Sequence, residues 1–244
     1  MPLNKLIASV VALAGVTTFA NASTVDMQFV GMGHGWQTAV TVNSITQSRI
    51  FTGERLHQFS NGTGMATRLE GQTIATYSTD LFQDVASSGA VFELASTADI
   101  HVNDENAHRS ALIQNLLRYH ANFDQSTLAH DSRRNDFATA FQLALWELVY
   151  EPQLSYDGAL GTMSLTSGAM TVTRPDGGQI GWWVRNYFNQ FAQASNNFHA
   201  GNVGLIALTN DQYMDQVTTV PVPLPSTAAL AVAGLSFAST RRRR

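Results

Sequence analysis

Two short segments carry side chains that could react with each other. The first, Tyr77-Ser78-Thr79-Asp80-Leu81, places a hydroxyl and a carboxylate two residues apart. The second, Phe141-Gln142-Leu143-Ala144-Leu145-Trp146-Glu147, supplies the side-chain amide of Gln142. A nucleophile that attacks such an amide expels ammonia and leaves an ester or a thioester, and a hydroxyl needs a positioned base to do so. Ser78, Asp80 and Gln142 are therefore the candidate reactive set.

Both segments resemble motifs of the bacterial thioester domain of surface adhesins. In that family a Tyr-Cys-x-Asp strand meets a Gln-x-Ala-x-Trp helix, and the cysteine condenses with the glutamine to an internal thioester that an amine on a host molecule can open. The matching residues here are Tyr77, Asp80, Gln142 and Trp146, and the order of elements is similar over residues 27–216. The resemblance implies an adhesive role at the cell surface.

Ser78 stands where this family has its cysteine, and the chain contains no cysteine at all. A thioester is therefore excluded, because a hydroxyl replaces a thiol whose pKa is about 8.5. Three alternatives remain. Ser78 forms a hydrogen bond with Gln142, or it forms an ester to Gln142 with Asp80 or a histidine as base, or the similarity of the motifs is accidental. We expect the hydrogen bond, since buried polar groups are nearly always paired, and hence no catalytic residue and no cofactor.

The elements that must position these residues can be predicted from hydrophobic periodicity. Alternation with period two, or a continuous apolar run, indicates strands at residues 24–31, 38–43, 72–82 and 203–208. Apolar residues at helical spacing indicate helices at residues 106–123, 135–150 and 180–194. Strands at both ends with helices clustered between them predict a single α+β domain over residues 23–219, with an antiparallel or mixed sheet packed against about three helices.

Two details of this arrangement bear on the site. Gln142 shares a helical stripe with Ala138 and Trp146, so we expect this stripe to lie on the sheet face that carries Ser78, with the two side chains in contact. The glycine-rich segment Gly31-Met32-Gly33-His34-Gly35 predicts a turn that ends the first strand, and residues 158–173 predict a loop or a weak hairpin.

The first 22 residues have the features of a signal peptide. Lys5 precedes a short apolar run, and Ala20-Asn21-Ala22 provides the small-x-small pattern that signal peptidase recognises. The apolar run of residues 6–16 falls short of the roughly 20 residues that span a bilayer. We expect cleavage after Ala22, so that the mature chain begins at Ser23.

Residues 220–244 have the features of a sorting signal. A linker containing Pro223-Leu224-Pro225 precedes a short apolar stretch and a terminal arginine block, Arg241, Arg242, Arg243 and Arg244. The order resembles the PEP-CTERM signal processed by exosortase-type enzymes, although that signal usually has Pro-Glu-Pro. The alternative is a sortase-type enzyme, because Leu224-Pro225-Ser226-Thr227-Ala228 resembles a sortase signal. Either interpretation predicts transient anchoring of the tail in a membrane.

Composition agrees with export. Charged residues make up 13% of the chain and apolar residues 44%, whereas soluble proteins average about 25% charged residues. No cluster of basic residues precedes the tail, so no nucleic-acid partner is expected. The sequence thus predicts a non-enzymatic, exported protein of the cell surface or extracellular matrix, adhesive or structural, with exopolysaccharide or envelope components as partners.

Two other functions compete with this prediction. A secreted polysaccharide hydrolase would use carboxylates such as Asp80, Glu147 and Glu151, but no pair spacing is diagnostic and Glu147 is expected at the surface. A carbohydrate-binding module would use exposed aromatic residues such as Trp182, although packing in the core is the expectation for Trp182, Trp183 and Tyr187. Four histidines lie near carboxylates in the sequence but lack the spacing of metal ligands, so we expect no metal site. We expect them instead in solvated loops: His101, His108, His120 and His130.

Overall fold

The computed structural model describes residues 23–96, 107–150, 163–197 and 206–218. The predicted signal peptide, the predicted sorting signal, His101 and Glu151 lie outside these ranges. Within them, no helix is long and apolar enough to cross a membrane.

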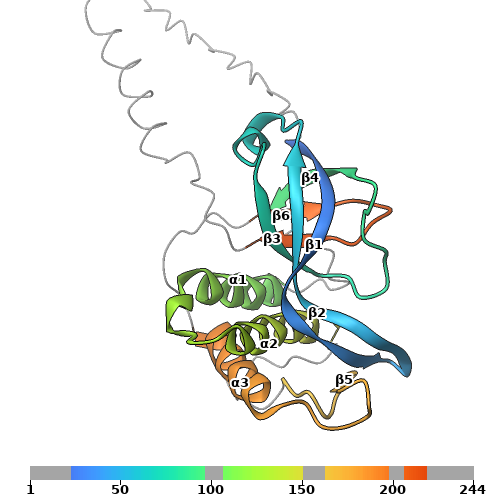
Figure 1. Ribbon diagram of the computed structural model, residues 1–244, viewed down its shortest axis with the longest axis vertical. Coiled ribbons are helices and arrows are strands. Elements are labelled where there is room, and N and C mark those ends of the chain that lie inside the picture. The colour runs from blue at the N-terminus through green and yellow to red at the C-terminus, as the bar shows by residue number, and fades with distance from the viewer. Residues whose placement is uncertain (1–22, 97–106, 151–162, 198–205, 219–244) are drawn as a thin grey trace, which may run out of the picture.

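Every described strand belongs to one antiparallel sheet with the order β2-β3-β7-β6-β4-β1-β5. An additional pairing of β1 with β2 closes six of the strands into a ring, and β5 adds to the far end of β1. Figure 1 shows the β1–β2 hairpin continuing beyond this ring along the helices. The strands are β1 (Thr24–Val42), β2 (Ile45–Ser60), β3 (Thr73–Ser78), β4 (Ala90–Ser96), β5 (Met170–Thr173), β6 (Ile206–Thr209) and β7 (Gln216–Thr218).

Of the three α-helices, α2 packs against the β1–β2 hairpin, and α1 and α3 pack against α2 and against each other (Figure 1). They are α1 (Ala107–Asn122), α2 (Asp131–Tyr150) and α3 (Trp182–Asn197). A short 3₁₀ helix at Gln125–Thr127 lies between α1 and α2, and another at Gly64–Arg68 lies between β2 and β3. α2 is central, and its residues 137–148, most of which are apolar, are buried on all sides. The predicted α+β class and single domain are confirmed.

Two separate apolar cores follow from the alternation of side chains along the strands. The core inside the ring contains residues such as Met27, Phe59 and Phe92. The larger core lies between the ring's outer face and the helices, and includes Tyr77 on β3 and Val217 on β7. Successive residues of β3 therefore point into different cores, which decides the surroundings of Ser78.

The predicted turn at residues 31–35 is wrong, because β1 runs through this segment, with shifts in register before, within and after it. Gly35 pairs with Gly53 of β2, both with positive φ. A Cβ atom added to Gly53 would lie 2.2 Å from the carbonyl oxygen of His34. The glycines thus permit a close crossing of two long strands, which a local sequence pattern does not distinguish from a turn.

Candidate functional site

The side-chain amide of Gln142 lies directly against the backbone of Ser78. Its Nε2 donates to the Ser78 carbonyl oxygen at 2.7 Å, and its Oε1 accepts from the Ser78 N–H at 3.1 Å. Both residues are fully buried. This arrangement fixes the orientation of the carboxamide, because only Nε2 can donate and only Oε1 can accept.

The expectation that α2 covers the sheet face carrying the Ser78 side chain is wrong. Tyr77 packs edge-on against Phe141 of α2, with 4.4 Å between ring centroids. Ser78, the next residue on the strand, points to the opposite face and into the ring. Contact with Gln142 is therefore made by the Ser78 backbone and not by its hydroxyl.

Gln142 takes the place of a missing strand partner. The N–H of Thr79 donates to the backbone carbonyl oxygen of Asp215, just before β7. Because backbone groups alternate in direction along a strand, the N–H and carbonyl of Ser78 point to the β2 side. The pairing of β2 with β3 ends at Arg55 and Thr76, which leaves Ser78 without a backbone partner there. The carboxamide, itself a peptide-like group, completes both hydrogen bonds of Ser78.

Gln142 belongs to a stripe of polar residues on α2 that serves the same purpose along its length. We call Asn135, Thr139 and Gln142 the polar stripe. The Asn135 Oδ1 accepts from the N–H of Gly35 at 3.2 Å, and the Thr139 hydroxyl accepts from the N–H of Trp36 at 2.9 Å. That hydroxyl also donates to the carbonyl oxygen of Thr52 at 3.0 Å.

Sequence reasoning identified Gln142 but missed Asn135 and Thr139. The available signal was their spacing, because positions i, i+4 and i+7 place three polar side chains on one face of a helix that is otherwise apolar. Each satisfies a backbone group where the strand ladder is interrupted, and an unpaired backbone group in these places would be costly.

The hydroxyl of Ser78 is engaged within its own chain segment. It donates to the carbonyl oxygen of Asp80 and accepts from the Asp80 N–H at 3.1 Å. The Asp80 carboxylate does not serve as its base, since Oδ1 accepts from the N–H groups of Phe82 and Gln83 at 2.8 and 3.3 Å and lies 3.3 Å from the Tyr150 hydroxyl. Asp80 thus organises the chain after β3.

Comparison with known proteins adds one resemblance of fold. No protein-family model matches the chain, and no curated protein matches it in sequence. Among solved structures, it is similar to the N-terminal thioester domain of fibronectin-binding protein SfbI from Streptococcus pyogenes. The TM-score is 0.41 and the sequence identity is 11%, over 80% of this chain and 100% of that one. This similarity transfers no residue role.

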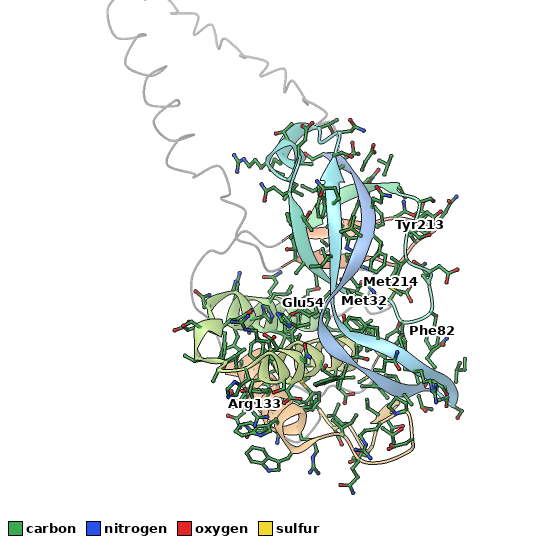
Figure 2. All side chains as sticks on the ribbon, viewed as in Figure 1. Met32, Glu54, Phe82, Arg133, Tyr213 and Met214 are labelled. Atoms are coloured by element: carbon green, nitrogen blue, oxygen red, sulfur yellow. The ribbon has the colours of Figure 1, made fainter. Side chains whose placement is uncertain are left out.

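Tyr77 anchors a second buried network on the helix side. Its hydroxyl donates to Oε1 of Glu54 at 3.1 Å and lies 3.0 Å from Nε2 of His120. Since the hydroxyl has a single proton, His120 is the neutral tautomer that carries its proton on Nε2. Burial lowers the pKa of His120 to about 3, and burial followed by the charge of Glu54 raises the pKa of Tyr77. Figure 2 shows Glu54 where the ring meets the helices.

The prediction of a solvated loop position for His120 is wrong, because His120 lies buried on α1 among Phe137, Phe141 and Phe191. His130 is exposed, as predicted. Among the described residues, no group of three or more histidine or carboxylate side chains lies close enough to hold a metal ion.

The interior of the ring holds a polar set beside its apolar core. Nδ1 of His57 lies 2.9 Å from the Thr76 hydroxyl, which donates to Oε1 of Gln216 at 2.9 Å. Burial, and next the positive charge of Arg55, lower the pKa of His57 to about 4. Burial also lowers the pKa of Arg55 to about 10. These groups share the face of the sheet to which the Ser78 side chain points.

Two of the three carboxylates considered for a hydrolase, Glu147 and Asp80, are engaged by backbone groups. Glu147 is fully buried, which corrects the expected surface position, and its Oε1 accepts from the N–H of Ser164 at 2.9 Å. Asp80 is committed to backbone groups, and neither residue lines a hollow described here. Trp146 is also fully buried, one turn after Gln142.

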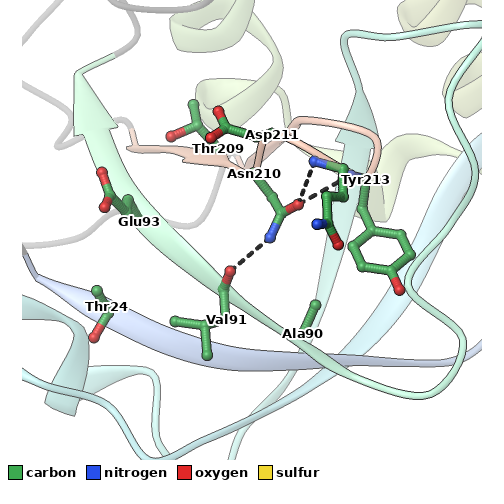
Figure 3. Close-up of a pocket in the computed structure, with 9 residues that line it drawn as sticks. Thr24, Ala90, Val91, Glu93, Thr209, Asn210, Asp211 and Tyr213 are labelled. Atoms are coloured by element: carbon green, nitrogen blue, oxygen red, sulfur yellow. Dashed lines mark hydrogen bonds between the residues drawn. The ribbon is translucent and has the colours of Figure 1, made fainter.

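The larger described hollow, of about 550 Å³, lies on the outside of the ring where β4 meets the β6–β7 turn (Figure 3). Asn210 organises it by donating from Nδ2 to the carbonyl oxygen of Val91 at 2.7 Å. Its Oδ1 accepts from the N–H groups of Gln212 and Tyr213 at 2.7 and 3.0 Å. The polar atoms of Asn210 are therefore used by the turn itself.

Proposed function

We propose that this chain is an exported, non-enzymatic protein of the cell surface or extracellular matrix, in which Gln142 and Ser78 form a structural clasp in place of a covalent bond. The observation that carries the proposal is the pair of hydrogen bonds between the Gln142 carboxamide and the Ser78 backbone. These hydrogen bonds fasten the central helix α2 to β3 at the end of the ring, so the function of the clasp is mechanical. The protein as a whole then has an adhesive or structural role.

The chemistry of the pair supports a non-covalent role. An ester would require the Ser78 oxygen to reach the Gln142 carbonyl carbon, with a base to take the hydroxyl proton. That hydroxyl points into the ring and donates to the Asp80 backbone instead. On the helix side, the buried His120 is hydrogen-bonded to the Tyr77 hydroxyl, and burial lowers its pKa.

Export is supported by the sequence features at the two ends. The pattern Ala20-Asn21-Ala22 behind a short apolar run predicts removal of residues 1–22. The proline linker, the short apolar stretch and the arginine block predict exosortase-type or sortase-type processing after export. A protein delivered this way meets exopolysaccharide and envelope components first.

Peptide mapping of the mature protein tests the clasp. Trypsin places Ser78 in the peptide of residues 69–109 and Gln142 in that of residues 135–185, because Pro175 protects the bond after Arg174. We expect both peptides at their unmodified masses, together with an N-terminal peptide that begins at Ser23. A linked pair that lacks one ammonia would overturn the non-covalent role.

Replacing Arg241 to Arg244 with serine tests the sorting signal. Each arginine costs roughly 2.5 to 3.5 kcal/mol at a bilayer centre, so the block should hold the tail on the cytoplasmic side until processing. We expect the variant to be mislocalised or released unprocessed, as measured by cell fractionation and intact mass. Wild-type location and wild-type tail length would rule out this role for the arginines.

A further inference from the structure

Three tryptophans lie exposed where the hairpin and the helices meet, although packing in the core was predicted for two of them. The exposed fraction is 44% for Trp36 on β1, 59% for Trp182 and 38% for Trp183 at the start of α3. That prediction is thus wrong for Trp182 and Trp183, whereas Tyr187 is buried as expected. Exposed indoles that converge in this way usually mark a binding surface.

An ion pair holds these rings in fixed positions. Nε1 of Trp36 donates to Oδ1 of Asp136 at 2.9 Å, and NH1 of Arg133 donates to Oδ2 of the same carboxylate at 3.0 Å. The Arg133 guanidinium lies 3.8 Å from the centre of the Trp183 ring, a cation–π contact. Trp182 then meets Trp183 edge-on, with 4.5 Å between ring centroids. Arg133 belongs to the first turn of α2, and Figure 2 shows it close to α3.

Trp182 is the most exposed of the three tryptophans, and it lines a hollow of about 380 Å³. The other lining residues, Arg185, Asn186 and Asn189, follow it along one stripe of α3. Among the described residues, the two asparagine amides and the Arg185 guanidinium have no hydrogen-bond or ion-pair partner. The hollow therefore combines an accessible aromatic ring with unused donors and acceptors.

We propose that this stripe of α3 is a binding site for a pyranose-based polysaccharide that carries carboxylates. A pyranose ring has an apolar C–H face and a rim of hydroxyl groups. The face stacks on Trp182, and the hydroxyl groups bond with Asn186 and Asn189, whose amides both donate and accept. Arg185 takes the carboxylate, because a guanidinium and a carboxylate form strong paired hydrogen bonds.

A carboxylate-bearing polysaccharide suits the positive charge of Arg185 in the hollow, although the whole chain is negatively charged. The chain has a formal net charge of -4, so a polyanion is not attracted to it in general. The carboxylate of Asp136 is already shared by Trp36 and Arg133, which leaves Arg185 as an open cation in the hollow. The binding site is inferred from the contacts on α3, and only the choice of a polysaccharide as its ligand rests on the proposed role at the cell surface.

Native affinity electrophoresis of the full chain tests the site, with Arg241 to Arg244 replaced by serine so that the tail cannot retain a polyanion. Gels contain alginate as a polyuronate, dextran as a neutral polymer, or no polymer. We expect retardation in alginate to exceed that in dextran. Trp182→Ala should weaken binding to alginate about tenfold, the loss of one stacking contact. Arg185→Gln should reduce retardation in alginate to the dextran level.

Phe82→Ala is the matched control, because Phe82 is also an exposed aromatic, at 43%, and lies on another side of the molecule (Figure 2). Its retardation should equal that of the parent chain. No retardation of the parent in either polymer, or equal retardation of the Trp182 variant, would overturn the site. Equal retardation in both polymers would overturn the carboxylate specificity. A linked Ser78–Gln142 peptide would instead overturn the proposed non-covalent function and leave the gel result standing.

Discussion

Gln142→Met should destabilise the protein by roughly 2 to 4 kcal/mol while leaving its fold unchanged. Methionine has a similar volume but cannot replace the carboxamide, so the buried N–H and carbonyl of Ser78 lose their partners. An unsatisfied buried group costs roughly 1 to 3 kcal/mol. Because whole domains are stable by only about 5 to 15 kcal/mol, the loss would be plain in urea denaturation monitored by tryptophan fluorescence.

Gln190→Met on α3 is the matched control. Gln190 is half-buried and, within the described part of the chain, its side chain makes no hydrogen bond. Its replacement should change the free energy of unfolding by less than about 0.5 kcal/mol, as is usual for such positions. Gln142→Ala should cost more than Gln142→Met, since it adds a cavity. A Gln142→Met variant as stable as the control would show that the clasp has no structural function.

The helices and the two reactive segments could be predicted because their signals are local. Apolar spacing located α1, α2 and α3 to within a few residues, and the same stripe placed Gln142 against the sheet. The face of the sheet could not be predicted, because it depends on how β3 pairs with β2 and with β7, and β7 is far from β3 in sequence. A shift of one residue in that pairing exchanges Tyr77 and Ser78 between the two cores.

The strand order shows the same limit. β2 was overlooked, although it pairs with β1 over most of its length, because several of its buried central residues are polar, namely Thr52, Arg55 and His57. Arg55 and His57 point into the ring, where sequence patterns predict apolar residues. The prediction for Trp182 and Trp183 was wrong in the opposite direction, since these aromatic residues are exposed and not buried. Such exceptions mark the places where polar networks and binding surfaces replace ordinary packing.

The buried histidines should make the protein sensitive to acid. The pKa values of His57 and His120 are lowered to about 4 and about 3, whereas an unfolded histidine has a pKa near 6.5. The unfolded state therefore binds more protons as the pH falls below about 6.5, and stability decreases until the folded histidines also titrate. Each histidine should contribute roughly 2 to 3 kcal/mol to the loss of stability between pH 7 and pH 4.

His120→Phe isolates one share of this effect. His120 is surrounded by Phe137, Phe141 and Phe191, so a phenyl ring suits the site, and Tyr77 keeps Glu54 as its acceptor. Denaturant titrations at pH 7 and pH 4 should show a smaller difference for this variant than for the wild type. His130→Gln, at an exposed position, should leave the difference unchanged. An identical loss in all three proteins would mean that carboxylates elsewhere, and not the buried imidazole of His120, govern unfolding in acid.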